Sequence, residues 1–142
     1  MELESNALAL PVATMLLLTL VVWVTLFVTR MKYLTANKVD AERLKTPADV
    51  QALIPGDVSA AANNFKNLFE VPVVFYVTCF YLTLFGQVDS LHLGCAWVFV
   101  AGRILHSFIH CSYNRVMHRF LVYLLSSLAL WVMVVRAFLA AV

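Results

Sequence analysis

The chain has 142 residues, of which 63% are hydrophobic and 13% are charged, and its formal net charge is +2. A soluble domain typically carries about 25% charged residues, so this composition excludes an ordinary water-soluble protein. A helix needs about 20 apolar residues to cross the hydrocarbon core of a bilayer, and four crossings use most of the chain. The sequence therefore predicts one membrane domain over residues 1–142, with little left for a separate soluble module.

The apolar runs predict an all-α integral membrane protein, a bundle of four transmembrane helices. We expect the helices at about residues 7–31, 57–85, 90–111 and 115–141, with a polar loop at about 32–56. The first run is longer than a signal-peptide core and has no small-residue cleavage site, so we interpret it as a retained helix. Four crossings place both termini on the same side of the membrane.

Basic residues gather in two of the connections between these helices. Because Lys and Arg are retained on the cytoplasmic side, the long first loop and the third turn should be cytoplasmic and both termini outside. The basic residues are Arg30, Lys32, Lys38, Arg43, Lys45 and Lys66 in the first connection and Arg115 and Arg119 in the third. The other side carries Glu2, Glu4, Asp89 and Arg136. This asymmetry accounts for the net charge, so no nucleic-acid partner is expected.

The polar first loop contains one short predicted helix. In "TPADVQALIPG", Thr46 can cap a helix that has Pro47 at its first position and stops before Pro55. Asp57 or Ser59 can then cap the second membrane helix.

The stretch "NNFKNLFEVP" places polar residues at the start of the second membrane helix. Asn63, Asn67 and Glu70 stand at i, i+4 and i+7, which is one helix face, and Pro72 can kink the helix beside them. An ionisable group in an apolar run needs a partner, and Arg103 is the candidate for Glu70. Two interpretations stay open: these residues hold helices together, or they bind a ligand.

The third helix carries Arg103, His106 and His110 at i, i+3 and i+7. Arg103 lies about nine residues, or roughly 13 Å, from the cytoplasmic turn, which is too deep for its head group to reach water easily. It must therefore be paired, with Glu70, with a ligand carboxylate, or with both. His106 and His110 have the spacing of a metal-binding pair, but no third ligand stands at convincing spacing and no metal is expected.

The fourth helix opens with Arg119 and, one turn later, Tyr123. An arginine in a partly dehydrated cleft can hold a thiol as its thiolate, because a fixed positive charge lowers the thiol pKa. The alternative is that Arg115 and Arg119 anchor the helix at the interface and Tyr123 belongs to the aromatic belt. Among the cysteines, only Cys111 lies near the cytoplasmic turn, where its reactivity merits a test.

The order and spacing of these polar residues resemble the MAPEG family, the membrane-associated proteins in eicosanoid and glutathione metabolism. The resemblance covers nearly the whole chain: four membrane helices, a polar first loop, Asn67-x-x-Glu70, Arg103-x-x-His106, and Arg119 with Tyr123. It implies a homotrimer with a glutathione site between neighbouring subunits, open to the cytoplasmic side. A lipophilic second substrate would arrive from the bilayer.

The resemblance also implies roles for single residues. Arg119 matches the arginine that stabilises the glutathione thiolate, and is the expected catalytic residue. The residues expected to bind glutathione are Arg30, Asn67, Glu70, Arg103, His106 and Tyr123.

Several positions depart from the pattern of glutathione-using members. Two arginines that precede the asparagine of helix two are replaced by Ala60 and Asn63, the tyrosine of helix three by His110, and Phe120 follows the catalytic arginine. These differences indicate a divergent branch, which we expect to be bacterial and located in the inner membrane. The resemblance implies a membrane-bound glutathione-dependent transferase or peroxidase for lipophilic electrophiles or hydroperoxides. The alternative is a non-catalytic membrane protein of the same fold that binds a lipid or a protein partner.

Overall fold

A computed structural model describes residues 6–142, and these residues form a bundle of helices without any strand. Four stretches are long and apolar enough to cross a membrane. They are α1 (Ala9–Ala36), α3 (Ala60–Asn67) continued by α4 (Val71–Leu84), α5 (Ser90–Cys111) and α6 (Val116–Leu139). The predicted fold of four membrane-spanning helices is thereby confirmed. Glu2 and Glu4 lie outside the described residues.

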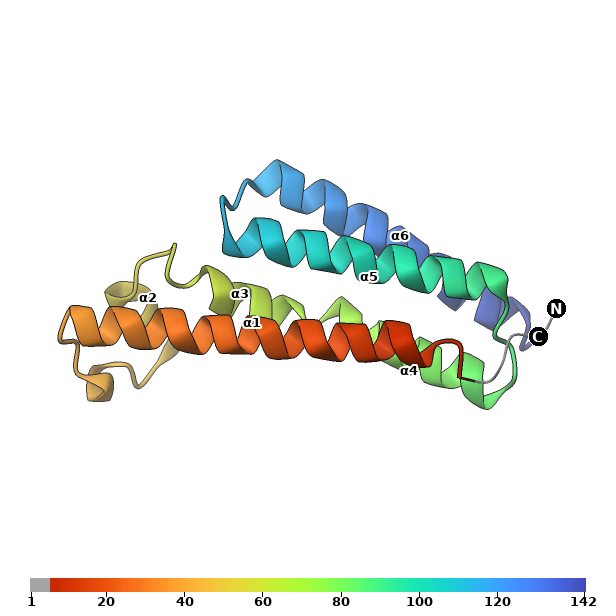
Figure 1. Cartoon of the computed structure of the whole chain (residues 1–142), viewed down its shortest axis with the longest axis horizontal. Coiled ribbons are helices and arrows are strands. Elements are labelled where there is room, and N and C mark those ends of the chain that lie inside the picture. Colours follow the sequence, from red (N-terminus) through yellow and green to blue (C-terminus); the bar gives the residue numbers. More distant parts are fainter. Residues whose placement is uncertain (1–5) are drawn as a thin grey trace.

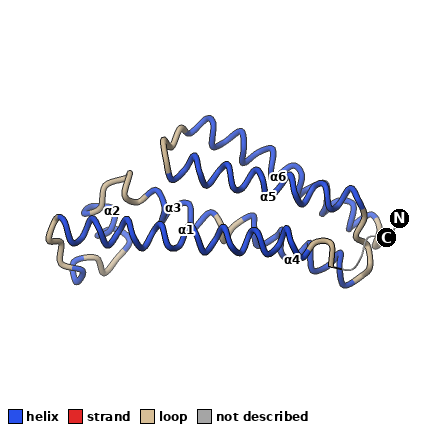
Figure 2. Tube along the Cα trace, viewed as in Figure 1, coloured by secondary structure: helices blue, strands red, loops and turns tan. Residues whose placement is uncertain are grey.

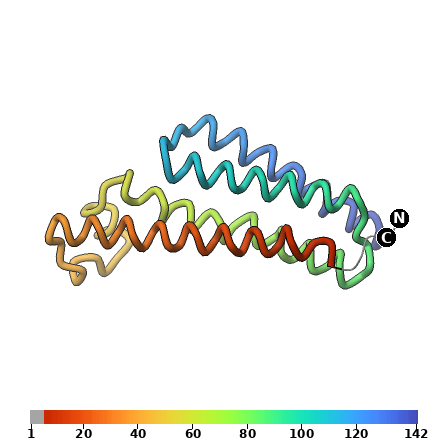
Figure 3. The backbone as a smooth tube through the Cα atoms, in the orientation of Figure 1, coloured from red at the N-terminus to blue at the C-terminus, as the bar shows by residue number. Residues whose placement is uncertain are grey.

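The four crossings alternate in direction, as Figures 1 and 3 show. The loop between α1 and α3 and the turn between α5 and α6 lie towards one end of the bundle, which we call the basic end (Figure 1). The start of α1, the α4–α5 turn and the end of α6 lie at the opposite end. The two connections that hold most basic residues therefore lie towards the same end. The chain is a multi-pass integral membrane protein, and the assignment of the basic end to the cytoplasm stays a prediction.

The outer surface of the bundle is apolar, which suits a lipid environment. The long helix α1 buries only Pro11, Met15 and Val22, while Leu17 and Phe27 on the same helix are more than half exposed. Water would hydrate these side chains at a large free-energy cost, whereas lipid tails are as apolar as they are. The apolar exterior therefore requires the bilayer that the composition predicts.

The interior of the bundle is packed around an aromatic pair. The rings of Phe75 on α4 and Phe99 on α5 stack with their centroids 4.5 Å apart. Met15, Leu82 and Leu130 are completely buried in the same core cluster. The core thus draws side chains from all four membrane-spanning segments.

The loop at the basic end is more ordered than a plain linker. Helix α1 extends to Ala36, past the predicted end at residue 31, because neither glycine nor proline interrupts that stretch. A short 3₁₀ turn, η1 (Ala41–Arg43), and the helix α2 (Pro47–Leu53) follow. Thr46 caps α2, as predicted, in a reciprocal capping box with Asp49. The Tyr33 hydroxyl donates a hydrogen bond to the Leu53 carbonyl at 3.2 Å and ties the loop to α1.

The expected side-chain cap of the second membrane helix is wrong. Ser59 occupies the position before α3, but its backbone is already helical, with φ −79° and ψ −9°, and its side chain makes no capping bond. An N-cap hydroxyl needs an extended backbone to reach back to the helix, so the helical backbone of Ser59 prevents the contact. The turn is closed by backbone bonds instead, among them Ala60 N–H to the Asp57 carbonyl at 3.3 Å.

The helix expected at residues 57–85 is divided in two by a break at residues 68–70. Figure 2 shows this break as a loop segment between α3 and α4. Pro72 has no N–H to donate, and its ring crowds the carbonyl of Leu68. Glu70, which precedes α4, leaves the helical conformation with φ −101° and ψ −105°. The break decides where the polar side chains of this segment lie.

Helices α5 and α6 lie very close to each other at Gly102. A Cβ atom at this position would lie 2.6 Å from the Cβ of Ser126 on α6. Small residues allow such close approach between membrane helices. The contact lies next to Arg103 and therefore sets how close α6 stands to the polar face of α5.

We expect Gly102→Ala to lower the free energy of unfolding by about 1–3 kcal/mol, because the added methyl group would force α5 and α6 apart. Gly94→Ala is the matched control, since none of the described residues comes within 4 Å of its Cβ position. Alanine also favours a helix over glycine, so the control should be neutral or stabilising. Thermal unfolding in detergent, followed by circular dichroism, measures both. Equal stability of the two variants would contradict the close contact.

An ion pair closes the opposite end of the bundle. Arg136 on α6 donates to both carboxylate oxygens of Asp89, with Nη2–Oδ2 at 2.7 Å and Nη1–Oδ1 at 3.3 Å. Asp89 also caps α5 by accepting a hydrogen bond from the backbone N–H of His92 at 2.8 Å. The His92 hydrogen bond above all, and then the Arg136 contacts, hold the pKa of Asp89 below its ordinary value. The ionised carboxylate therefore favours the folded protein.

This lowered pKa predicts how the contribution of Asp89 depends on pH. The stabilisation is fully present above the ordinary pKa of an aspartate, about 3.9, and is lost as the pH falls through the lower folded-state value. The carboxylate is partly exposed, so solvent screening keeps the effect small. We expect Asp89→Asn, which preserves a capping side chain, to lower the melting temperature near neutral pH. The difference from wild type should shrink below about pH 4, and a difference independent of pH would contradict the ion pair.

Candidate functional site

A polar cleft lies where the end of α3 meets α5 and the first turns of α6. Its volume is about 250 Å³. The residues that line it are Asn67, His106, Val116, Arg119, Phe120 and Tyr123. Four predicted site residues therefore line one cleft. Arg103 does not line it but contacts two of them, Asn67 and Tyr123. We call this the polar cleft.

Arg103 is the fully buried charge of the site, with none of its surface exposed. Its Nη2 donates to the backbone carbonyl of Asn67 at 3.2 Å. Its guanidinium carbon lies 5.5 Å from the ring centroid of Tyr123, within range of a cation–π interaction. Nε and Nη1 are buried and make no hydrogen bond with the described residues. Arg103 thus joins three helical segments and retains donors for a further acceptor.

The expected ion pair between Glu70 and Arg103 is wrong. Glu70 is exposed, and none of the ion pairs between described residues joins it to Arg103. The helix break moves Glu70 off the face it would share with Asn67 in a continuous helix. The same break leaves the Asn67 carbonyl with only a long 3.4 Å bond from the Glu70 N–H, so it can accept from Arg103. A backbone carbonyl therefore takes the place predicted for the carboxylate.

His106 connects α5 to the start of α6. Its Nδ1 lies 3.2 Å from the carbonyl oxygen of Arg119. A carbonyl can only accept, so this contact places the proton on Nδ1 and leaves Nε2 as a possible acceptor. The ring packs edge to face against His110, with centroids 5.6 Å apart, and lies 5.9 Å from the ring of Tyr123. His106 thus positions the first turn of α6 against the polar face of α5.

Arg119 lies at the mouth of the polar cleft, half buried in the first turn of α6. Its Nη1 donates to the side-chain carbonyl of Asn114 at 2.7 Å. Asn114 adopts a left-handed backbone conformation, with φ 49°, which asparagine tolerates better than most residues. The turn before α6 therefore anchors the guanidinium beside the cleft. Our sequence reasoning missed Asn114; its one signal was an asparagine in the turn before the arginine.

Asn64 is a second residue that the sequence reasoning missed. Its side chain is completely buried, accepts a hydrogen bond from the Ser107 hydroxyl at 3.4 Å, and donates to the Cys111 sulfur at 3.6 Å. The predicted face began one residue earlier, at Asn63, which is exposed. Two adjacent asparagines carry no sequence signal that says which one faces α5.

Arg30 does not join the polar cleft of its own chain. It lines a separate cleft of about 510 Å³ between α1, the loop and α3, together with Lys45, Asn63 and Lys66. The chain therefore brings five of the seven predicted site residues together and leaves Arg30 and Glu70 outside. Their predicted contact with glutathione has no support from the geometry within one chain.

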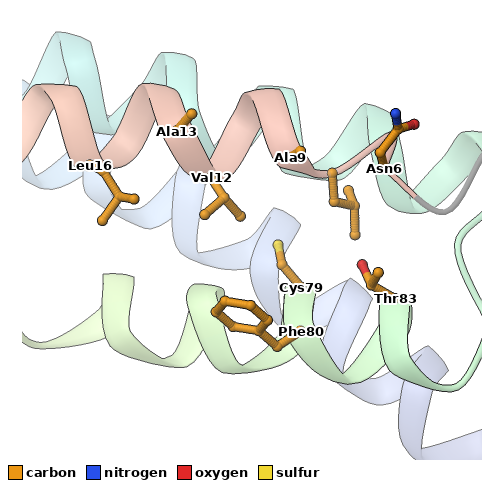
Figure 4. A pocket seen from close by; sticks show the side chains of 9 residues that line it. Asn6, Ala9, Val12, Ala13, Leu16, Cys79, Phe80 and Thr83 are labelled. Atoms are coloured by element: carbon orange, nitrogen blue, oxygen red, sulfur yellow. The ribbon is translucent and has the colours of Figure 1, made fainter.

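A third hollow lies between α1 and α4 near the opposite end. Val12 and Leu16 of α1 and Cys79, Phe80 and Thr83 of α4 line its wall (Figure 4). Among residues 6–142, no arginine, histidine or carboxylate lines it. The polar cleft is therefore the better candidate for chemistry.

A double-mutant cycle tests which residue pairs with Arg103. We expect Glu70→Gln and Arg103→Ala to couple by no more than about 0.5 kcal/mol, because no ion pair joins the two described side chains. Tyr123→Leu and Arg103→Ala should show a coupling energy of about 0.5–2 kcal/mol from the desolvated cation–π contact. Thermal unfolding of the single and double variants provides the measurement. Strong coupling of Glu70 with Arg103 would restore the ion pair and contradict the structure.

Comparison with known proteins gives one match. The model of the MAPEG family matches residues 8–139, nearly the whole chain. No curated protein and no solved structure matches it. The match covers all four membrane-spanning segments and every residue of the polar cleft.

Proposed function

The chain belongs to the MAPEG family, and we propose that it is a membrane-bound glutathione-dependent transferase or peroxidase acting on lipophilic electrophiles or hydroperoxides. The observation that carries this proposal is the anchored guanidinium of Arg119 at the mouth of a polar cleft. Asn114 holds it on one side, and the cleft continues inward to His106 and Tyr123.

The role proposed for Arg119 is to hold the sulfur of glutathione as a thiolate. A fixed positive charge close to a thiol favours its ionised form and lowers its pKa. The thiolate attacks an electrophilic carbon, forms a carbon–sulfur bond and displaces the leaving group with its electron pair. With a hydroperoxide, the sulfur attacks the terminal oxygen, and an alcohol leaves after protonation. A second glutathione then converts the glutathione sulfenic acid to the disulfide and water.

The rest of the cleft suits the polar backbone of glutathione. Arg103 lies behind Asn67 and Tyr123, its Nε and Nη1 have no partner among the described residues, and its positive charge would attract a glutathione carboxylate bound in the cleft. The Asn67 side chain and the Tyr123 hydroxyl can hydrogen-bond the peptide groups. These residues would bind and orient glutathione, while Arg119 acts on its sulfur.

The polar cleft of one chain is smaller than most small-molecule sites. Small-molecule sites usually enclose roughly 300–1,000 Å³, whereas the polar cleft of one chain encloses about 250 Å³. A neighbouring subunit packed against α6 would enlarge and close the cleft, and the exposed Val116 and Phe120 leave room for that contact. We therefore propose that the complete glutathione site forms between subunits of a trimer.

The departures from the family pattern predict a low affinity for glutathione. Ala60 is buried and carries no charge, and Asn63 points into the cleft of Arg30. Each missing guanidinium would have made charge-assisted hydrogen bonds to glutathione, and each such bond contributes about 1.5–3 kcal/mol. Binding should therefore be weaker than in members that keep both arginines.

We expect Arg119→Ala to lower kcat/KM for conjugation of glutathione to a lipophilic chlorodinitrobenzene by roughly 100-fold, because the thiolate loses its counter-charge. The control is Arg115→Ala, since Arg115 is exposed and does not line the cleft. Detergent-purified variants with unchanged circular dichroism give the comparison. Full activity of Arg119→Ala would remove Arg119 from the mechanism.

A second variant separates the charge of Arg119 from its bulk. Asn114→Asp places a carboxylate beside Nη1, where it cancels part of the positive charge. The pKa of bound glutathione, followed by thiolate absorbance, should then rise without loss of the side chain. Calorimetry decides whether glutathione binds at all; no binding and no thiol-dependent turnover would contradict the proposal and favour a non-catalytic member of the fold.

A further inference from the structure

The cleft that contains Arg30 gathers positive charge from three separate segments of the chain. Arg30 comes from α1, Lys45 from the loop before α2, and Lys66 from α3. The cleft encloses about 510 Å³, and none of the described residues that line it is a carboxylate. We call it the basic cleft. It is separate from the polar cleft and shares none of its lining residues.

The nearby acids do not neutralise this charge. Glu42 lies 3.8 Å from Lys45, but both side chains are more than 70% exposed, so the attraction is strongly screened. The Asp49 carboxylate is engaged by Thr46, at 3.0 Å from its N–H and 2.7 Å from its hydroxyl. Arg30 and Lys66 form no ion pair within the described residues. The basic cleft therefore has a net positive charge available to an anion.

The walls of the basic cleft are amphiphilic. Val50 and Ile54 supply apolar surface, and Thr46, Gln51 and Ser59 supply hydroxyl and amide groups. A small soluble anion would use only the polar groups. A molecule with an anionic head and an apolar continuation would use both.

The position of the basic cleft matches the head-group level of a bilayer. Arg30 is the first charged residue after the uncharged apolar run of α1, which ends at Thr29. Lys66 lies in α3 just before the apolar segment of α4 begins. Basic residues beside the end of a membrane helix attract anionic lipids, because the head groups lie at that depth.

We propose that the basic cleft binds the phosphate head group of an anionic phospholipid in the leaflet at the basic end. The Arg30 guanidinium can bind two phosphate oxygens at once, and the ammonium groups of Lys45 and Lys66 add positive charge around them. The acyl chains of this lipid would lie in the bilayer, and the apolar side chains of the cleft would contact the part of the lipid next to the head group. This inference does not depend on glutathione chemistry in the polar cleft.

The test compares two triple variants that remove equal charge. R30Q/K45Q/K66Q removes the cations of the basic cleft, and K32Q/K38Q/R43Q removes three exposed cations of the same region that do not line it. Each full-length protein is placed in nanodiscs of phosphatidylcholine with or without phosphatidylglycerol, and bound lipid is measured by native mass spectrometry. We expect the cleft variant to lose roughly tenfold more affinity for phosphatidylglycerol than the control variant.

Other outcomes overturn the proposal. Equal loss in both variants would mean that loop charge attracts anionic lipid without a site. Displacement of phosphatidylglycerol by dissolved inorganic phosphate would identify a soluble phosphate as the occupant. Loss of glutathione binding with unchanged lipid preference would assign the basic cleft to the thiol ligand. If the cleft triple variant fails to fold, R30Q/K66Q against K32Q/R43Q gives the same comparison with two charges removed from each.

Discussion

The burial of Arg103 inside an apolar bundle is the constraint on which the arrangement of the other helices depends. A guanidinium at this depth is costly unless polar groups surround it. One helix break and one aromatic ring meet that requirement: the Asn67 carbonyl accepts from Nη2, and Tyr123 lies over the charge. Segment α3, helix α5 and helix α6 must therefore converge at this residue. The polar cleft lies at their point of convergence.

Pro72 has a larger effect than a local kink. In a continuous helix the Asn67 carbonyl would accept the N–H of Val71 in the next turn, and Glu70 would point along the same face. The break leaves that carbonyl available to Arg103, and Glu70 is exposed. A backbone acceptor thus replaces an acidic side chain, which leaves the site of one chain with a net positive charge. Such a site favours an anionic ligand.

The two ends of the bundle are stabilised in different ways. At the opposite end, Asp89 and Arg136 form a two-pronged ion pair that joins the α4–α5 turn to α6. At the basic end, hydrogen bonds to asparagines and carbonyls hold the chain, as Asn114 holds Arg119 and the Arg119 carbonyl meets His106. The cations of the basic end are thereby left largely without acidic partners. Both proposed ligand sites depend on that imbalance.

The sequence by itself determined the membrane class, the four crossings, the alternation of basic and non-basic connections, and the grouping of Arg103 with His106 and of Arg119 with Tyr123. These features depend on composition, apolar run length and helical spacing, which are local properties of the chain. The cap of α2 by Thr46 is local in the same sense. Tertiary structure alone decided that Asn64 rather than Asn63 faces α5, that Arg103 meets a carbonyl rather than Glu70, and that Arg30 lies in another cleft. Those outcomes depend on which helix faces which and on a backbone break, and spacing along one helix contains no information about its neighbours.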